Sequence, residues 1–264
     1  MNKLNISLDI ASEMEDTQTA VRLRQRFSDT DGQMMLRLDT DGLLLVSDGQ
    51  VLKGDFSRME RRIKPSNLNG ELIVKAARIK NAEGPLTVID ATAGLGEDSF
   101  LLAAAGFNVK LFERNPVIYE LLRDALERAE KNPALSDIVA RMELFNEDSI
   151  EALKCLAPPD VILLDPMFPE RQKSALVKKK LQMIQKLEIP CADEEELVAA
   201  AISASPKKLV IKRPPKGPYL AGIKPDYSLE GKAVRFDCIT YPKKKILING
   251  GCYENRQTDS RWQH

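Results

Sequence analysis

The stretch that most constrains the fold is VIDATAGLG, residues 88–96. An apolar run over Leu86–Asp90 ends in an acidic residue and leads directly into a glycine-bearing loop. This pattern predicts a buried strand, a tight turn and a helix that begins at Glu97. Gly94 and Gly96 let the backbone approach a ligand closely, because they carry no side chain. Open α/β sheets bind ligands at the carboxyl ends of their strands, so we expect a binding site at this turn.

Strand and helix patterns alternate along most of the chain after this point. The predicted helices are Glu71–Lys80, Glu97–Ala105, a helix opened by Pro116, Leu176–Leu187 and Asp193–Ala204; the predicted strands are Leu86–Asp90, Val109–Phe112, Met142–Phe145, Val161–Leu164, Leu209–Ile211, Val234–Thr240 and Lys245–Ile248. Regular βα alternation predicts an α/β fold with a doubly wound, mostly parallel sheet of seven strands. The last two strands are expected to form an antiparallel edge.

The first part of the chain has a different pattern. Short apolar runs within residues 34–56 are separated by Asp-Gly pairs at 41–42 and 48–49, which is typical of antiparallel hairpins. We therefore expect a small β-rich N-terminal domain over residues 1–68, a main domain over residues 69–252 and a polar tail over residues 253–264.

Composition excludes several classes of function. The one histidine is His264 at the chain terminus, which disfavours Ser-His-Asp, Cys-His and His-ligated metal mechanisms. The four cysteines include no CxxC pair, so we expect reduced thiols, a cytoplasmic protein and no metal. No apolar run is long enough to span a membrane, and the N-terminus has no signal-peptide pattern.

Charge is unevenly distributed although the net charge is zero. Residues 165–264 carry 19 Lys and Arg against 12 Asp and Glu, which favours a face that meets an anion such as nucleic acid. The basic residues that we select as candidate RNA contacts are Arg61, Arg62, Arg171, Lys173, Lys212 and Arg213. A solvated surface remains the alternative for each of them.

Acidic residues recur at or just after the ends of successive predicted strands, at Asp90, Glu113, Asp148 and Asp165. Glu113 is suitably placed to accept the hydroxyls of a ribose, as in dinucleotide-binding domains. However, Ser99 stands where the third glycine or alanine of the GxGxxG fingerprint belongs.

The first turn of the predicted helix also argues against a dinucleotide. Glu97 and Asp98 place two negative charges where a pyrophosphate prefers none. They suit a ligand with an amino group, such as the methionine part of S-adenosylmethionine.

The stretch LLDPMFPE, residues 163–170, resembles the (Asp/Asn)-Pro-Pro-(Tyr/Phe) motif of methyltransferases that act on exocyclic amines of bases. An aryl amine is a poor nucleophile because its lone pair is delocalised into the ring. Asp165 and the Pro166 carbonyl can accept hydrogen bonds from the NH2 group and aim that lone pair, while Phe168 can stack on a flipped base. A simple proline turn with a buried phenylalanine is the structural alternative.

Five segments together resemble the ribosomal small subunit methyltransferase J family: DATAGLGEDSF (90–100), LFERNP (111–116), LLDPMFPERQKSALVKK (163–179), VIKRP (210–214) and RFD (235–237). The resemblance implies a class I, Rossmann-like methyltransferase that uses S-adenosylmethionine to methylate N2 of a guanine in small-subunit (16S) rRNA. It implies rRNA or a 30S particle as partner. The cofactor contacts that it implies are Glu97, Asp98, Glu113, Arg114, Asp148, Ser149 and Asp165, and we add Asp90, Gly94 and Gly96 for the methionine end.

Alternative functions stay open at this point. A methyltransferase of a small molecule or of another nucleic acid would share the cofactor half of the site. A non-catalytic RNA-binding assembly factor and a dehydrogenase are weaker alternatives. The sequence leaves the oligomeric state open.

Overall fold

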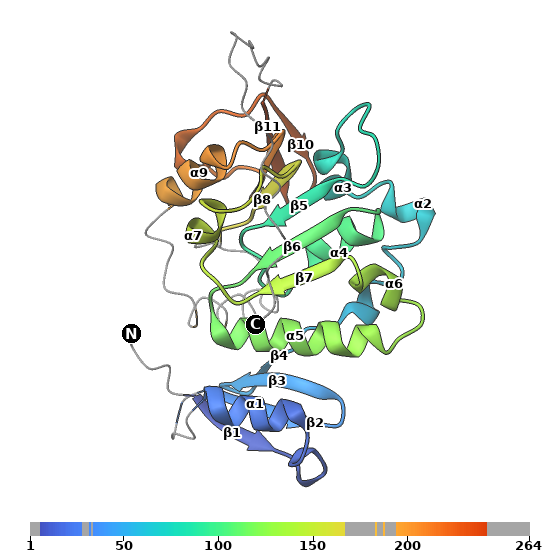
Figure 1. Ribbon diagram of the computed structural model, residues 1–264, viewed down its shortest axis with the longest axis vertical. Helices are drawn as coiled ribbons and strands as arrows, with labels where there is room; N and C mark the ends of the chain where they lie inside the picture. Colours follow the sequence, from blue (N-terminus) through green and yellow to red (C-terminus); the bar gives the residue numbers. More distant parts are fainter. Residues whose placement is uncertain are drawn as a thin grey trace, which may run out of the picture.

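The computed structural model describes residues 6–27, 32, 34–166, 183, 187 and 194–241. Its centre is a seven-stranded sheet with the order β10-β11-β9-β8-β5-β6-β7 (Figure 1). The strands are β5 (Thr87–Asp90), β6 (Asn108–Phe112), β7 (Met142–Phe145), β8 (Val161–Leu164), β9 (Lys208–Arg213), β10 (Tyr227–Glu230) and β11 (Arg235–Thr240). Five of them are parallel, and β11 and β10 form an antiparallel edge beside β9. The predicted mostly parallel sheet is thus confirmed.

Both faces of the sheet are covered by helices, as the unbroken apolar strands require. Neighbouring residues of β5 point to opposite faces: Val88 belongs to one hydrophobic core and Ile89 to another. The first core is covered by α3 (Leu72–Ala77) and α4 (Glu97–Ala104), and the second by α7 (Ser149–Leu153) and α9 (Glu194–Ser203).

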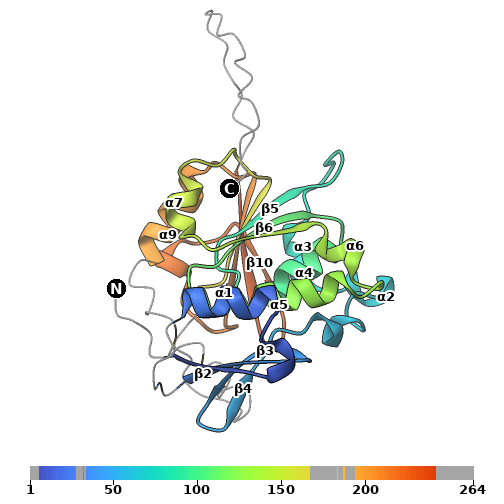
Figure 2. The same ribbon diagram turned by 60° about the horizontal axis from the view of Figure 1, so that its bottom comes forward.

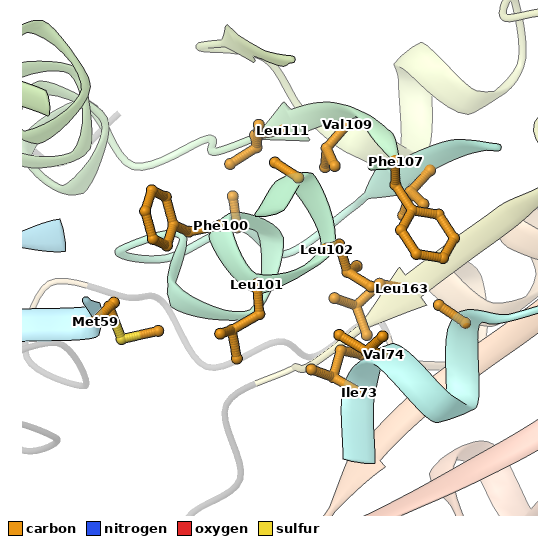
Figure 3. Close-up of a cluster of buried hydrophobic side chains, with 14 of the residues drawn as sticks. Met59, Ile73, Val74, Phe100, Leu101, Leu102, Phe107, Val109, Leu111 and Leu163 are labelled. Atoms are coloured by element: carbon orange, nitrogen blue, oxygen red, sulfur yellow. The ribbon is translucent and has the colours of Figure 1, made fainter. Parts of the chain in front are cut away.

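Helix α4, which carries the end of the predicted binding turn, is fixed from several sides. Figure 3 shows it between β6, which carries Val109 and Leu111, and α3, which carries Ile73 and Val74. All four of these side chains are at most 2% exposed, so α4 packs against close-packed neighbours on both sides.

The N-terminal residues form a separate four-stranded sheet of β1 (Ile6–Ile10), β2 (Met34–Asp39), β3 (Gly42–Ser47) and β4 (Gln50–Leu52). The two predicted hairpins are present, and Asp48 and Gly49 both have positive φ, as a tight two-residue turn requires. Sequence reasoning missed α1 (Gln18–Arg26) and the parallel pairing of β1 with β2. That pairing joins residues far apart in sequence, so no local sequence pattern predicts it.

Helix α5 (Pro116–Glu130) lies between the two sheets and packs on both (Figure 1). Val117, Ile118 and Leu121 face the N-terminal sheet, whereas Leu122 and Ala125 face the core of the main sheet. In Figure 2, α1 and α5 lie on the same side of the strands β2–β4.

Two ion pairs to one buried carboxylate fix α1 to α5. The Glu120 carboxylate is fully buried and contacts Nε of Arg22 at 2.9 Å and Nη1 of Arg26 at 3.2 Å.

Phe56, Met59 and Leu68 belong to the core of the main sheet, and the Phe56 ring stacks on Phe100 with centroids 4.6 Å apart. The division at residue 68 stays a prediction. The short elements that complete the described chain are η1 (Ser12–Met14), η2 (Phe56–Met59), α2 (Pro65–Leu68), α6 (Ser136–Val139) and η3 (Leu220–Gly222).

The antiparallel edge differs in detail from the sequence prediction. Its outer strand is β10, which precedes β11 and which we did not predict. The predicted strand Lys245–Ile248, the polar tail and most of the helix Leu176–Leu187 lie outside the described residues. Of that helix, Met183 and Leu187 are described as helical, and both are buried in the core beneath α5. Among the described residues, no helix is long and apolar enough to cross a membrane.

Candidate active site

A cavity of about 570 Å³ opens at the carboxyl ends of β5, β6 and β8. Its volume lies in the range that small-molecule sites usually have. The walls are the turn after β5, the residues that follow β6, β7 and β8, and a contribution from the N-terminal region through Leu52, Lys53, Asp55 and Arg58.

The two glycines of the turn have different tasks. Gly94 and Gly96 both have left-handed φ, at 55° and 73°. A Cβ atom on Gly94 would meet nothing closer than the Thr92 carbonyl at 4.0 Å, so this position leaves the cavity open. A Cβ atom on Gly96 would stand 2.8 Å from Cδ1 of Leu122, so this glycine lets the turn pack closely on α5.

Asp90 ends β5 beneath the turn and is 3% exposed. Its carboxylate accepts a 2.6 Å hydrogen bond from the Ser99 hydroxyl and a 3.1 Å bond from the Thr92 backbone N–H. The pKa of Asp90 is raised to about 7: burial is the largest cause, the hydrogen bonds from Ser99 and Thr92 lower the pKa, and the nearby charges of Asp98 and Asp165 raise it. Asp90 therefore supports the turn from below and titrates close to neutrality.

Glu113 follows β6 and connects the glycine turn to the start of α5. Oε2 accepts the backbone N–H of Gly94 at 3.0 Å, and Oε1 accepts that of Asn115 at 2.8 Å. Asn115 in turn caps α5 by accepting the N–H groups of Val117 and Ile118. This bracing role was missed, because the sequence indicated only that Glu113 stands at a strand end.

Asp148 and Arg114 form the opposite wall. Asp148 caps α7 by accepting the Ile150 N–H at 2.9 Å, and Arg114 Nη1 is 3.6 Å from its Oδ2. Both side chains are more than 40% exposed, and Ser149 beside them is buried. Arg114 and Asp148 thus place charged side chains at the cavity, and the helix cap fixes one oxygen of the Asp148 carboxylate.

Asp165 lies directly after β8 and contacts Lys212 of β9. The Lys212 Nζ atom is 2.9 Å from Oδ2 of Asp165 and 2.6 Å from Oδ2 of Asp98. The Thr92 Oγ1 accepts the Asp165 backbone N–H at 2.6 Å. The Asp165 side chain is 40% exposed, but it lies in the recess of the cavity that it lines. This recess raises the pKa of the Asp165 carboxyl, and the Lys212 ammonium acts in the opposite direction.

Every residue that was predicted to bind cofactor lines the cavity, and so does Pro166. Their roles remain predictions, since a position in the wall does not by itself define a contact. Phe168, Arg171 and Lys173 lie outside the described residues.

The predicted RNA contacts separate into different environments. Arg61 is exposed, and Arg62 forms a two-pronged ion pair with Glu71 at 2.8 Å. Lys212 lies inside the cavity instead of on the outer surface. Arg213 is 2% exposed, and its Nε donates to the Pro218 carbonyl at 3.0 Å. In this arrangement neither Lys212 nor Arg213 presents its cation to an external phosphate.

The sequence prediction did not place Lys212 in this cavity, although its position in the sheet could have indicated it. Lys212 is near the carboxyl end of a parallel strand, at the same sheet edge as Asp90, Glu113 and Asp165. The contribution of the N-terminal region had no such signal, because it depends on how that region packs on α5.

The chain has clear relatives. A family model described as "Putative SAM-dependent methyltransferase" matches residues 18–241, a range that includes every residue lining the cavity. The protein named ribosomal RNA small subunit methyltransferase J from Pseudomonas syringae pv. tomato is 39% identical over 249 residues, which cover 91% of this chain and 91% of that protein. Its namesake from Dechloromonas aromatica is 41% identical over 228 residues, or 83% of this chain and 91% of that protein.

A solved structure is similar over nearly the whole chain. The crystal structure of a SAM-dependent methyltransferase from Neisseria gonorrhoeae matches with a TM-score of 0.70 and 31% identity, covering 89% of this chain and 95% of that one.

Proposed function

The chain belongs to the ribosomal RNA small subunit methyltransferase J family of SAM-dependent methyltransferases, and from this premise we propose that it methylates the exocyclic N2 amine of a guanine in small-subunit (16S) rRNA. The observation that carries this proposal is the placement of Asp165 and Pro166. They line the same cavity as the glycine turn after β5. The residues proposed to orient the base, Asp165 and Pro166, and the turn proposed to bind the cofactor therefore line one cavity.

The residues present fit S-adenosylmethionine. Asp98 and Glu97 suit the amino group of the methionine part, Glu113 suits the ribose hydroxyls, and Asp148 suits the adenine amine. Each Glu113 oxygen accepts a backbone N–H, and these bonds fix the orientation of the carboxylate in the cavity wall. Apolar side chains for the adenine ring come from the wall residues Phe112, Ile150 and Leu197. When bound, the cofactor supplies a methyl group activated by a positively charged sulfur.

Asp165 and the Pro166 carbonyl hold the target amine. Accepting both N–H bonds draws the nitrogen toward tetrahedral geometry and frees its lone pair for attack on the methyl carbon. Positioning of this kind accounts for much of the rate in a reaction between two bound groups. Because the pKa of Asp165 is raised by its recessed position, its carboxylate is also a suitable acceptor for the proton that the methylated nitrogen releases. We keep Phe168 as the predicted stacking partner of the base.

Basic residues outside the cavity provide the attraction for RNA. Arg61 is exposed on the loop that follows the cavity residue Arg58, and Arg171 and Lys173 follow the target-binding stretch in sequence. Phosphate contacts by such groups make binding strongly dependent on salt. We propose small-subunit rRNA or the 30S particle as partner, and hence a cytoplasmic place of action.

Mass-spectrometric mapping of methylguanosines in small-subunit rRNA tests the proposal. Cells that lack the protein should lose N2-methylguanosine at one position, and the wild-type gene but not its Asp165→Ala variant should restore it. Unchanged rRNA methylation in the deleted strain would overturn the proposal. If the purified protein instead consumes S-adenosylmethionine with a small molecule and without RNA, the small-molecule alternative holds. Binding to 30S particles with no measurable affinity for S-adenosylmethionine would favour a non-catalytic assembly factor.

A further inference from the structure

Lys212 is held between two carboxylates at the junction of the cofactor turn and the target-binding residues. Its Nζ atom contacts Asp98, in the first turn of α4, at 2.6 Å and Asp165, at the end of β8, at 2.9 Å. Only a quarter of the Lys212 side chain is exposed. The ammonium therefore makes short, charge-assisted contacts in a recess, where such contacts are strong.

The charges around Asp165 come from three elements. Asp90 of β5 and Asp98 of α4 are negative neighbours, and Lys212 and Arg213 of β9 are positive. Asp98 raises the pKa of the Asp165 carboxyl in addition to the effect of burial, while Lys212 lowers it more than Arg213 does. Loss of the Lys212 charge would leave Arg213 as the positive neighbour of Asp165, against Asp90 and Asp98. The Asp165 carboxyl would then bind a proton at higher pH.

Protonation would weaken the hold of Asp165 on the target amine and would remove its capacity to accept the amine proton. A carboxylate accepts hydrogen bonds through both oxygens, whereas a carboxylic acid presents a donor at one of them. The 2.9 Å contact between Lys212 Nζ and Oδ2 also restricts the orientation of the Asp165 carboxylate.

We propose that Lys212 is a positioning residue that keeps Asp165 ionised and orients its carboxylate for the target amine, and that through Asp98 it connects this group to the cofactor turn. This inference rests on the proposed function. In this proposal Lys212 acts inside the site on Asp165, and it is not one of the residues that contact RNA phosphates.

Two substitutions and a matched control test the inference in the full-length protein. Lys212→Met removes the charge and keeps much of the side-chain length, and Lys212→Arg keeps the charge. The control is Lys207→Met, which removes a Lys–Asp ion pair of 2.5 Å with Asp160 at the other end of the strand, away from the cavity. Methyl transfer to 30S particles is measured for all of them, with KM determined separately for S-adenosylmethionine and for the particle.

At pH 7, Lys212→Met should lower kcat by about 100-fold through misplacement and partial protonation of Asp165. Its KM for S-adenosylmethionine should not rise, because removal of Lys212 leaves the Asp98 carboxylate available to the amino group of the cofactor. The acidic limb of its pH–rate profile should move to higher pH, so that activity recovers in part as pH rises. Lys212→Arg should restore most of the rate, and Lys207→Met should behave as wild type.

A second measurement needs no activity. The pKa of Asp165 is read from carboxyl carbon NMR of the protein without cofactor, with the signal assigned by its loss in Asp165→Asn. It should be higher in Lys212→Met than in wild type and unchanged in Lys207→Met. An equal pKa in Lys212→Met and wild type would overturn the inference.

The kinetic outcomes separate the competing roles. An increase in KM for S-adenosylmethionine with unchanged kcat would make Lys212 a ligand of the cofactor carboxylate and overturn the inference. An increase confined to KM for the particle would make it a phosphate contact and overturn it likewise. If the wild-type protein fails to methylate rRNA, the proposed function fails, while the NMR titration still decides whether Lys212 holds Asp165 ionised.

Discussion

The Ser99 hydroxyl donates a 2.6 Å hydrogen bond to Oδ2 of Asp90, and both residues are buried. Ser99 occupies the position at which a dinucleotide-binding fingerprint needs glycine or alanine for close helix–strand packing. Here the position carries a side chain that supports an acid beneath the glycine turn. This contact gives a structural reason for favouring the methyltransferase interpretation of the turn over the dehydrogenase alternative.

The raised pKa of Asp90 predicts a stability that depends on pH. Because its folded-state pKa of about 7 lies above the unfolded value, the contribution of Asp90 to stability is complete at low pH and declines as pH rises from about 4 to 7. Asp90→Asn removes this titration. The stability of wild type relative to Asp90→Asn should fall by about 2 to 3 kcal/mol between pH 5 and pH 8, as measured by urea unfolding. A difference that stays constant over this range would contradict the prediction.

The two glycines of the turn should respond differently to alanine. Gly94→Ala meets open space, so it should cost only the left-handed strain of about 1–2 kcal/mol and weaken S-adenosylmethionine binding by narrowing the cavity. Gly96→Ala adds contact with the buried Leu122 and should destabilise by about 2–5 kcal/mol in total. Thermal unfolding and calorimetric cofactor titration of both variants check this. Equal losses of stability would show that the packing at Gly96 is unimportant.

Asp165 and Asp148 should affect different kinetic constants. Asp165→Ala should lower kcat by about 10²–10⁴-fold and affect KM for S-adenosylmethionine much less, because alanine can neither accept a hydrogen bond from the target amine nor take its proton. Near-normal methylation by Asp165→Ala would remove Asp165 from the proposed mechanism.

Asp148→Asn keeps a good helix cap for α7, so it should leave stability unchanged and raise KM for S-adenosylmethionine. Steady-state methylation of 30S particles separates this effect from that of Asp165→Ala.

The buried carboxylate of Glu120 should be important for stability. Glu120→Gln weakens two ion pairs between α5 and α1, but Arg22 and Arg26 are 21% and 30% exposed and can regain water. We therefore expect a loss of about 2 kcal/mol, below the usual range for a fully buried pair. Chemical denaturation measures it, with Glu127→Gln as control. The Glu127 side chain is 38% exposed and should contribute less than about 1 kcal/mol. Similar losses for both would show that burial of Glu120 has no special effect.

The sequence predicted the parallel core of the fold well, because strands buried on both faces appear as short apolar runs. Val161–Leu164 is such a run and forms β8 with the predicted bounds. The edge strand Tyr227–Glu230 was missed because its residues are half-buried or exposed and, among the described strands, it pairs only with β11. Helix α1 was missed because few of its residues are apolar.

The site was predictable to the extent that it depends on topology. The acids at strand ends meet around one cavity because the carboxyl ends of parallel strands share an edge of the sheet. The contacts of Lys212 and the bracing by Glu113 depend on side-chain direction and packing between elements. No periodicity in the sequence encodes those directions, so they became visible only in three dimensions.

Helix α5 has apolar side chains on two faces, and each face serves a different sheet. A chain shortened to residues 69–264 would expose Val117, Ile118 and Leu121 on the side that the N-terminal sheet covers, and it would weaken the packing of the helix that Asn115 caps beside the cavity. The β-rich N-terminal region therefore contributes to the support of the cavity as well as to its wall, through a helix that both sheets share.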